Sequence, residues 1–503
     1  MSAAAAIAAS LAVAAPVSAQ QVPPPGPQAA SDAVATAAAA LEPSGESAPA
    51  PDATVAMNVL AAALPELEGA ERRRARSLLA RPTDGAADQF RDGYPPNAPV
   101  AAAESPHFCV YWVNDPAYPD APELADGNGN GTPDYVEAIL EIAEFSYSVE
   151  VAPGHLGWAP PKPDAEGCGA DPSAHADVYL KQLGTKGLFG YESPDPGQGR
   201  ARSQYGYMVI DDDYATDEYG YSDPLEPARV TFAHEFNHLL QQNYDSFQDI
   251  WLFEATATWS EDFVYPDVND YVGYVQAFAS GPGTPITDRT AVRGLKIYGT
   301  AVWNHWLSGT GGGYGVSAVR RAWEVSDITD PADFAIAAYD KAIGKSKGRS
   351  FSREFAAFSA ATAEWRTGAG GFPDRALYPD MARKGGLREG QTKKFRLDHT
   401  AIRLLDVRAA GNGPIELGVR ADDGVRAGLA LVARDGEPLS GAVTVKKRFL
   451  TQGGNGTVTL DSPARYERIT AVVTNADGRV DGFGRADWDY RKDDQDFRVR
   501  LSG

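Results

Sequence analysis

The strongest chemical signal in the sequence is the segment His234-Glu235-Phe236-Asn237-His238. In a helix, residues four positions apart share a face, so the imidazoles of His234 and His238 can reach one metal ion. Glu235, next to the first histidine, can then act as general base on a metal-bound water. Apolar residues on both sides of the motif favour a buried helix. The pattern predicts a hydrolytic zinc site.

A catalytic zinc ion needs a third protein ligand and keeps one position open. Residues 251–259 read as a second helix with a single acidic side chain, Glu254, among apolar and small residues. Burying a lone carboxylate there is costly unless it is paired or bound to a metal. We therefore expect Glu254 to be the third ligand. Glu261 and Asp262 are the alternatives, but their place towards the end of the helix suits solvent or a contact behind the ligands.

Peptide hydrolysis also needs a group that stabilises the oxyanion, typically a Tyr, His or Arg across the cleft. Tyr298 and His305, in a helix expected at about 298–308, are the candidates for this catalytic role. For each of them, ordinary packing in the helical core is the alternative and the favoured interpretation.

A second metal motif occupies residues 126–137, which match the pattern D-x-N-x-N-G-x₅-E throughout. Calcium loops of this pattern offer oxygen donors at fixed positions and turn sharply at the glycine. Hard oxygen donors predict Ca²⁺, whereas transition metals prefer histidine. Pro133 and the lack of a preceding helix indicate a static, structural ion. The expected calcium ligands are Asp126, Asn128, Asn130, Asp134 and Glu137, with the backbone carbonyl of Thr132.

The composition excludes several classes of protein. The 503 residues include 46 basic and 68 acidic side chains, which gives a net charge of −22. Nucleic acid is therefore not expected as a partner, because phosphate binding needs clustered Lys and Arg. Two cysteines in this length exclude a disulfide-built scaffold and a cysteine-rich zinc finger. For the acidic stretch at 211–223, a solvated loop is favoured over a further ion site.

The N-terminal part of the chain divides into three segments. Residues 1–19 are apolar and end in Val17-Ser18-Ala19, a pattern that signal peptidase accepts, so they predict export; an alanine-rich tail is the alternative. Export would permit a disulfide between Cys109 and Cys168, although the sequence does not show that they meet. Residues 20–56 are rich in Ala and Pro and read as a flexible linker. Residues 57–95 read as a helical segment, either a pro segment or a solvated helix.

The rest of the chain predicts two domains. Residues 96–375 combine expected strands near 107–113, 177–183 and 205–211 with expected helices near 134–149, 226–244 and 249–263. Residues 390–503 contain short alternating runs separated by Gly, Asn and Asp, which is typical of an all-β sandwich. The sandwich carries no chemical constellation, and contact with a surface or polymer is its expected role. No run is long enough for a transmembrane segment.

The motifs also resemble a known group of enzymes. The pair HEFNH and WLFEATATW is similar to the gluzincin zinc metallopeptidases, in which HExxH gives two ligands and the base, and a Glu on the following helix gives the third ligand. WLFEA is similar to the WLNEG segment of zinc aminopeptidases. More closely, residues from about 107 to 366 resemble a family of secreted bacterial proteins classed by motif as metalloproteases. The similar segments are DGNGNGTPDYVE, GWAPP, DVYL, HEFNHLLQQNYD, FEATATWSEDFVYPDVNDY and YGTAVWNHWL.

The resemblance implies a fold and a function. The expected fold class is α+β, with a zincin-like domain of a small antiparallel or mixed sheet plus active-site helices, followed by the β-sandwich. The expected function is that of a secreted bacterial zinc peptidase, an endopeptidase first, which cleaves protein or peptide substrates by a zinc-activated water with Glu235 as general base. One alternative is a non-catalytic, calcium-stabilised surface-binding or adhesion protein that keeps the zincin fold, although the intact Glu235 argues against it. The other is a zinc aminopeptidase or other amide hydrolase, but no GxMEN-like segment precedes HEFNH.

Overall fold

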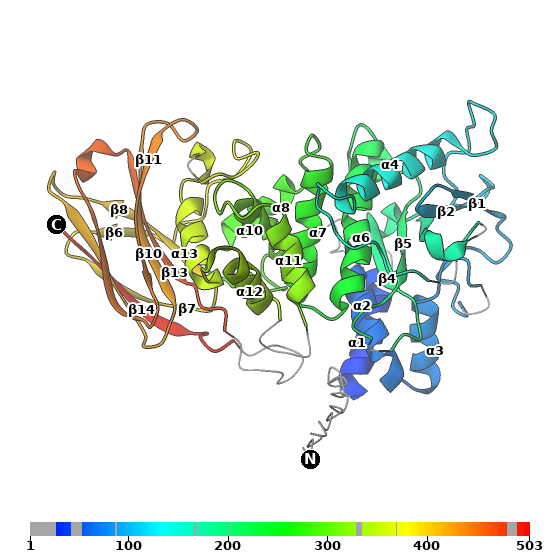
Figure 1. Cartoon of the computed structure of the whole chain (residues 1–503), viewed down its shortest axis with the longest axis horizontal. Helices are drawn as coiled ribbons and strands as arrows, with labels where there is room; N and C mark the ends of the chain where they lie inside the picture. The colour runs from blue at the N-terminus through cyan, green and yellow to red at the C-terminus, as the bar shows by residue number, and fades with distance from the viewer. Residues whose placement is uncertain are drawn as a thin grey trace, which may run out of the picture.

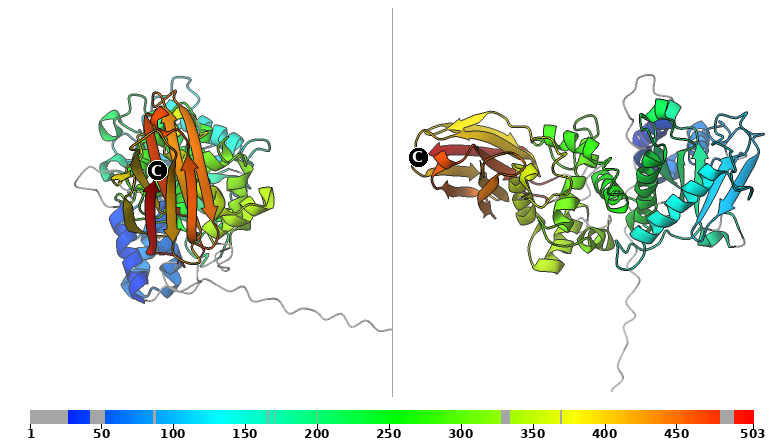
Figure 2. Two further views of the ribbon diagram at one scale, coloured as in Figure 1. Left: turned by 90° about the vertical axis from the view of Figure 1, so that its left-hand side faces the viewer. Right: turned by 90° about the horizontal axis from the view of Figure 1, so that it is seen from above.

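The computed structural model describes residues 27–41, 53–85, 88–164, 167–169, 171–199, 201–327, 334–368, 370–479 and 490–503. The expected export signal at 1–19 lies outside the described residues. The molecule combines many helices with several sheets, which confirms the α+β class (Figure 1). Two sheet regions lie at opposite ends, with helices between them (Figure 2). Among the described residues, no helix is long and apolar enough to cross a membrane.

A mixed sheet of five strands lies beside the zinc motif. Strands β2, β3 and β5 run parallel to one another, whereas β1 and β4 are antiparallel strands at the two edges. All residues of β3 and β5 are buried, as expected for strands covered on both faces of a sheet. A disulfide between Cys109 and Cys168 ties β2 to the loop before β3. The strand order is β1 (Val100–Glu104), β2 (Phe108–Val113), β3 (Ala176–Lys181), β5 (Gly206–Asp211) and β4 (Gly190–Pro194).

Helices cover both faces of this sheet. On one face lie α4 (Asp134–Glu150) and α6 (Leu225–Asp245), where Phe108 of β2 packs edge-on against Phe232 and Phe236 of α6. The other face packs against the N-terminal helices in a second apolar cluster. These helices are α1 (Pro27–Leu41), α2 (Thr54–Ala63) and α3 (Gly69–Leu78). The helix that carries the zinc motif is thus fixed by its contact with the sheet.

Helix α1 corrects the expectation of a flexible linker over 20–56. Its buried residues Ala30, Ala33, Val34 and Ala37 recur at helical spacing and pack in the same cluster as α2. Alanine is also the strongest helix former, so an alanine-rich segment with one apolar face becomes ordered once that face is covered. The helical segment expected over 57–95 begins with α2 and continues as the separate helix α3.

A group of helices follows α6 and forms the middle of the molecule. Trp303 is fully buried there and contacts Phe351, Phe355 and Phe358. The helices expected near 249–263 and 298–308 are present, whereas α8 and α11 were not expected. The short helix α5 (Thr216–Tyr219) precedes α6, and the helices that follow α6 are α7 (Ile250–Val264), α8 (Val272–Ser280), α9 (Lys296–Gly299), α10 (Ala301–Ser308), α11 (Ser317–Val325), α12 (Ile336–Lys347) and α13 (Phe351–Thr362).

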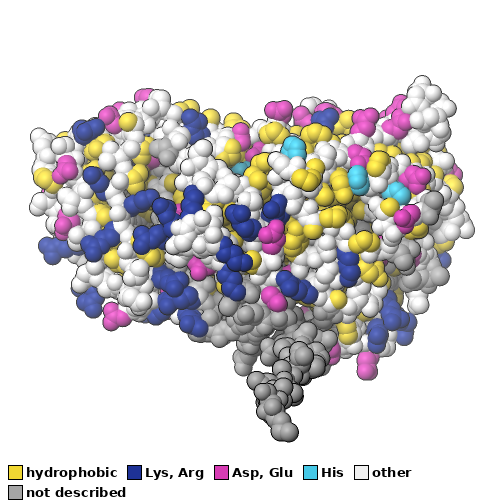
Figure 3. All heavy atoms as spheres, in the orientation of Figure 1, with side chains coloured by type: hydrophobic (Ala, Val, Ile, Leu, Met, Phe, Trp, Pro, Cys, Tyr) yellow, Lys and Arg dark blue, Asp and Glu magenta, His cyan; other side chains and the backbone are white. Residues whose placement is uncertain are grey.

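The C-terminal part consists of two antiparallel-rich sheets around one apolar core, as the alternating runs predict. Helix α13 packs on β10 and joins this part to the middle helices. Lys and Arg side chains gather over the C-terminal part on the face shown in Figure 3, despite the acidic total. One sheet has the order β11 (Ala442–Leu450), β10 (Ala427–Asp435), β13 (Arg468–Asn475), β8 (Ile402–Arg408), β6 (Gly386–Arg388); the other has β12 (Gly454–Leu460), β9 (Ile415–Ala421), β14 (Gln495–Ser502), β7 (Thr392–Leu397).

Candidate metal centre

The two histidines of the zinc motif lie one turn apart on α6, with their side chains converging. The Nε2 atoms of His234 and His238 are 3.0 Å apart. Both side chains are buried, and so is almost every residue of α6 from Val230 to Gln242, because the helix is enclosed by the sheet on one side and by α7 on the other. The i, i+4 spacing therefore brings the two imidazoles together as the sequence predicts.

Helix α7 brings Glu254 to the same point. Asp249 caps the start of α7 by accepting a hydrogen bond from the backbone N–H of Trp251. Glu254 Oε2 lies 3.3 Å from His234 Nε2 and 3.7 Å from His238 Nε2, and the residue is 0% exposed. Neither oxygen accepts a hydrogen bond from the described residues. A buried carboxylate without hydrogen-bond donors is costly unless a cation binds it.

The spacing of these three donor atoms fits zinc. A tetrahedral zinc ion with bonds of about 2.0–2.1 Å holds its ligand atoms roughly 3.3–3.5 Å apart. The three donor-atom separations among His234, His238 and Glu254 are 3.0, 3.3 and 3.7 Å, so they bracket this range. The donor set of two imidazoles and one carboxylate is also one that zinc prefers. Among the described residues, these three form one of two groups whose donor atoms lie close enough to hold an ion, and the other, Asp211 to Asp213, has no histidine.

Each imidazole is oriented by a partner on its other nitrogen. His234 Nδ1 lies 2.6 Å from Glu261 Oε1, and His238 Nδ1 lies 2.9 Å from Gln241 Oε1. An acceptor at Nδ1 keeps the proton there and leaves the Nε2 lone pair for a metal. Glu261, an alternative ligand in the sequence, instead lies behind His234. Burial raises the pKa of Glu261 to about 7, and the hydrogen bond with His234 opposes this rise.

A buried hydrogen-bond chain continues from His238 into the core. The amide of Gln241 donates to Asn237 Oδ1 at 2.7 Å, and the amide of Asn237 donates to Glu150 Oε2 at 2.7 Å. Glu150, the last residue of α4, is fully buried, and burial raises its pKa to about 8. Sequence reasoning missed Glu150. The available signal was its position on the face of α4 that also carries the buried residues Ile139, Ala143 and Ser146.

Glu235, the residue after His234, lies near the edge strand β4. A Cβ on Gly190 of β4 would lie 2.7 Å from Thr231 Cγ2 and 3.1 Å from Glu235 Cγ, so the close approach of strand and helix requires glycine there. Glu235 Oε2 accepts a hydrogen bond from the hydroxyl of Thr54, at 3.0 Å. No pattern in the sequence indicates this contact with α2.

The two expected oxyanion stabilisers occupy different places. The ring of Tyr298 on α9 stacks near that of His234, with centroids 6.1 Å apart, and is therefore beside the metal ligands. His305 on α10 packs against Tyr271, and its Nδ1 lies 3.7 Å from Asp262 Oδ2. Burial lowers the pKa of His305 to about 3, so its imidazole is neutral. Of the two, Tyr298 is the one whose position suits the role.

The expected calcium loop lies on the surface, before α4. Asp126 accepts hydrogen bonds from the backbone N–H groups of three loop residues, which lower its pKa, and Asp134 accepts one from Gly127. The amide of Asn128 donates to Glu137 at 2.9 Å, and that of Asn130 donates to the same carboxylate at 2.5 Å. The side chains at loop positions 3, 5 and 12 thus face one another, whereas that of position 1 binds the loop backbone. The carboxylates of Asp126, Asp134 and Glu137 do not form one group at metal-ligand spacing.

The first residues of the acidic stretch at 211–223 are not solvated, contrary to expectation, whereas Asp217 and Glu218 farther along are exposed. Asp211 and Asp212 are buried. The two oxygens of Asp211 accept four hydrogen bonds from backbone N–H groups and so hold the chain that turns after β5. Burial raises the pKa of Asp212 to about 9, and the neighbouring carboxylates of Asp211 and Asp213 add to the rise. This stretch shapes the sheet edge.

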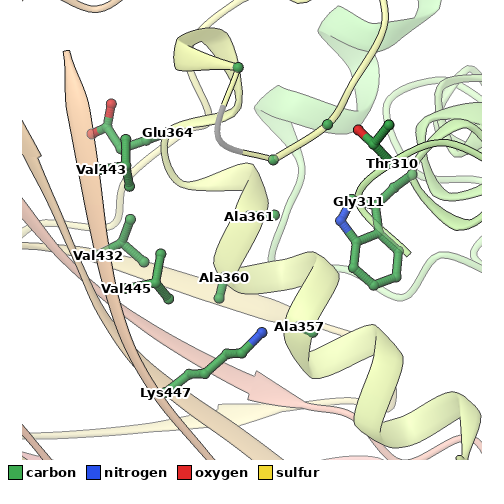
Figure 4. A pocket seen from close by; sticks show the side chains of 14 residues that line it. Thr310, Gly311, Ala357, Ala360, Ala361, Glu364, Val432, Val443, Val445 and Lys447 are labelled. Atoms are coloured by element: carbon green, nitrogen blue, oxygen red, sulfur yellow. The ribbon is translucent and has the colours of Figure 1, made fainter. Parts of the chain in front are cut away.

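A pocket elsewhere in the molecule contains none of the candidate residues. It lies between α13 and strands β10 and β11, and Figure 4 shows Ala357, Ala361, Val443 and Lys447 among its lining. Most of its side chains are small or apolar. The metal centre is therefore a separate feature of the molecule.

Comparisons with known proteins add little to this geometry. No family model matches the sequence, and no curated protein matches it. The pre-peptidase C-terminal domain of a collagenase from Bacillus anthracis is similar in structure, with 10% identity, a TM-score of 0.17, and coverage of 25% of this chain and 100% of that domain. A family GH115 4-O-methyl-α-glucuronidase has 8% identity and a TM-score of 0.13, with coverage of 69% of this chain and 53% of that enzyme. Because both TM-scores are very low, neither similarity carries an argument.

Proposed function

We propose that the chain is a zinc-dependent endopeptidase with a zincin-like catalytic domain, which the bacterial cell exports. The observation that carries the proposal is the buried carboxylate of Glu254, which has no hydrogen-bond donor and lies beside the converging Nε2 atoms of His234 and His238. The proposed general base Glu235 directly follows His234 in the same helix. A purely structural metal site would have no use for that base.

The roles of the residues follow from their places. His234, His238 and Glu254 would hold zinc, which supplies Lewis acidity towards a peptide carbonyl and an attacking water. Glu235 takes the proton from that water and passes it to the leaving amine. Glu261 and Gln241 keep the two imidazoles in the tautomer that binds metal.

The other candidates have supporting roles in the proposal. Tyr298, whose ring stacks near His234, would stabilise the oxyanion by a hydrogen bond from its hydroxyl. His305 contributes through packing against Tyr271 instead. Ca²⁺ binds the loop at 126–137 and stabilises the start of α4. The C-terminal sandwich, with Lys446, Lys447 and Arg448 on the outer strand β11, attaches the enzyme to a surface or polymer.

Cleavage of a casein substrate and of an N-acetylated peptide tests the function. The wild type should cleave both, because an endopeptidase does not need a free substrate amine. Glu235→Gln should keep its zinc and lose about 10²–10⁴-fold in rate, since it removes only the base. Glu141→Gln, on the exposed side of α4, is the matched control and should leave the rate unchanged.

Two results would change the proposal. Cleavage restricted to peptides with a free N-terminus would favour an aminopeptidase. Full zinc occupancy without cleavage by any form of the chain, including forms altered in the N-terminal helices, would favour the non-catalytic surface-binding protein.

A further inference from the structure

The N-terminal helix α2 contacts the proposed general base. Thr54, the first residue of α2, is 0% exposed although it carries a hydroxyl. The hydroxyl donates to Glu235 Oε2 at 3.0 Å and accepts a hydrogen bond from the backbone N–H of Glu192 at 2.7 Å. One side chain thus joins the catalytic helix α6 to the edge strand β4.

Thr54 of α2 contacts β4 at the place where an extended peptide substrate would pair with the strand. β4 is the edge strand on the side of the sheet next to the zinc motif, and the N–H of Glu192 points away from its neighbour β5 towards Thr54. Unpaired backbone groups of an edge strand are the groups with which an extended peptide pairs. Thr54 therefore occupies both a substrate-pairing group and the proton acceptor.

A second contact one turn further along α2 strengthens the first. The amide of Gln242 on α6 donates to the side-chain oxygen of Asn58, and also to Glu192 Oε2 at 3.0 Å. Thr54 and Asn58 are four residues apart and so share the face of α2 that is turned to α6 and β4. The helix packs on β4, with two polar anchors on this face.

The end of the N-terminal helices is fixed at a separate place. Arg81, just after α3, is 2% exposed and forms ion pairs with Asp164, Asp177 and Asp195 of the catalytic part. The hydroxyl of Tyr207 on β5 donates to the carbonyl of Ala80. This anchor lies away from the metal ligands, so it holds the helices without contacting the site.

We infer that residues 27–81 are a built-in inhibitor of the metal centre: α2 fills the strip along β4 on which an extended peptide would lie, and the Thr54 hydroxyl occupies Glu235. The inference rests on the proposed function. Substrate binding then requires α2 to leave β4, while the anchor at Arg81 can keep the helices attached. If α2 is an inhibitor, weakening the contacts of Thr54 should increase activity. If α2 were instead a structural part of the active enzyme, the same change should decrease activity.

Thr54→Val in the full-length zinc-loaded protein is the test. It keeps the shape of the side chain and removes both hydrogen bonds. Thr36→Val is the matched control, because the Thr36 hydroxyl is exposed and bonds only within α1, to the carbonyl of Asp32. We expect Thr54→Val to raise kcat/KM for the N-acetylated peptide about 5- to 30-fold over Thr36→Val, the effect of about one buried hydrogen bond. Thr54→Val with Asn58→Ala should raise it further.

A second measurement does not depend on catalysis. The rate at which dipicolinate removes zinc should rise in Thr54→Val and stay at the wild-type value in Thr36→Val, because α2 shields the centre. Equal cleavage rates and equal zinc-removal rates in the two variants would overturn the inference and leave the peptidase intact. Cleavage that persists in Thr54→Val/Glu235→Gln, or the absence of bound zinc in the wild type, would instead refute the proposed function, and the inference would fall with it.

Discussion

The zinc centre and the calcium loop are both metal motifs in the sequence, but the chain builds them in opposite ways. The donors His234, His238 and Glu254 are buried, and both histidines are held from behind by a side chain of α6 or α7. The donors of the loop at 126–137 are mostly exposed, and they hydrogen-bond to one another and to the loop backbone.

This difference shows how strongly each site should depend on its ion. In the buried centre, the Glu254 carboxylate has no hydrogen-bond donor among the described residues, so the cost of its burial is offset mainly by binding a cation. In the exposed loop, water and the asparagine amides satisfy the carboxylates. We expect zinc binding to be tight and sensitive to each partner, and calcium binding to be weak and replaceable.

The largest effect should come from one substitution made in both sites. Glu254→Gln removes the charge from the buried donor set, and zinc content after dialysis should fall from one ion per chain to nearly none, because only three protein ligands are available. Glu137→Gln makes the same change in the exposed loop and should leave zinc content unchanged. Zinc measured by mass spectrometry checks both. A full zinc complement in Glu254→Gln would show that Glu254 is not a ligand.

The next effect concerns the residue behind His234. Glu261→Gln keeps the size of the side chain but weakens its hydrogen bond to His234 Nδ1, and zinc affinity should fall about 10- to 100-fold. Competition with a fluorescent chelator measures this affinity. Glu141→Gln on α4 serves as the exposed control. If Glu261→Gln binds zinc as tightly as the control does, the imidazole is oriented by packing alone.

The grouping of His234, His238 and Glu254 could be predicted from the sequence because the signal is local. The i, i+4 histidines and one carboxylate in an apolar helix each specify their position within one element. The role of Glu261 could be predicted only in part. Its position seven residues after Glu254 places it two turns along the same face of α7. Only the packing of α7 on α6 shows that it contacts His234. The contacts of the centre with Glu150 and Thr54 depend on how distant elements pack and could be seen only in the structure.

Long-range contacts explain what could not be predicted. Thr54 meets Glu235 across 181 residues of sequence, and no local pattern marks a threonine for that contact. Strand β4, with Gly190 and Pro194 at its ends, lacks the alternation that identifies strands and forms because it pairs with β5 at the sheet edge. The composition of residues 20–56 predicts a linker, whereas the helical spacing of the buried alanines is what makes α1 an ordered helix.

A smaller effect should appear in the pH dependence of stability. Burial raises the pKa of Glu150 to about 8. The folded state therefore keeps a proton that the unfolded state releases at lower pH, so this group's contribution to stability is lost as the pH rises from about 5 to 8, by at most about 1.4 kcal/mol per pH unit. Glu150→Gln should flatten that slope. Urea unfolding of the metal-free protein at pH 5.5, 7 and 8.5 measures this slope. If Glu150→Gln and the control Glu141→Gln lose stability with pH equally, Glu150 does not carry the raised pKa.

The smallest effect should come from calcium. Its binding loop is exposed, and at ten times the dissociation constant a ligand adds only about 1.4 kcal/mol to the free energy of unfolding, or a rise of roughly 2–4 °C in Tm. Addition of CaCl₂ should produce that rise in the wild type and in Glu254→Gln, but not in Glu137→Gln, which lacks the bidentate carboxylate. Mg²⁺, which keeps its water shell, should have less effect. A calcium-dependent rise that survives Glu137→Gln would place the ion elsewhere, whereas a rise much above this range would mean that the exposed loop stabilises the fold as strongly as the buried centre does.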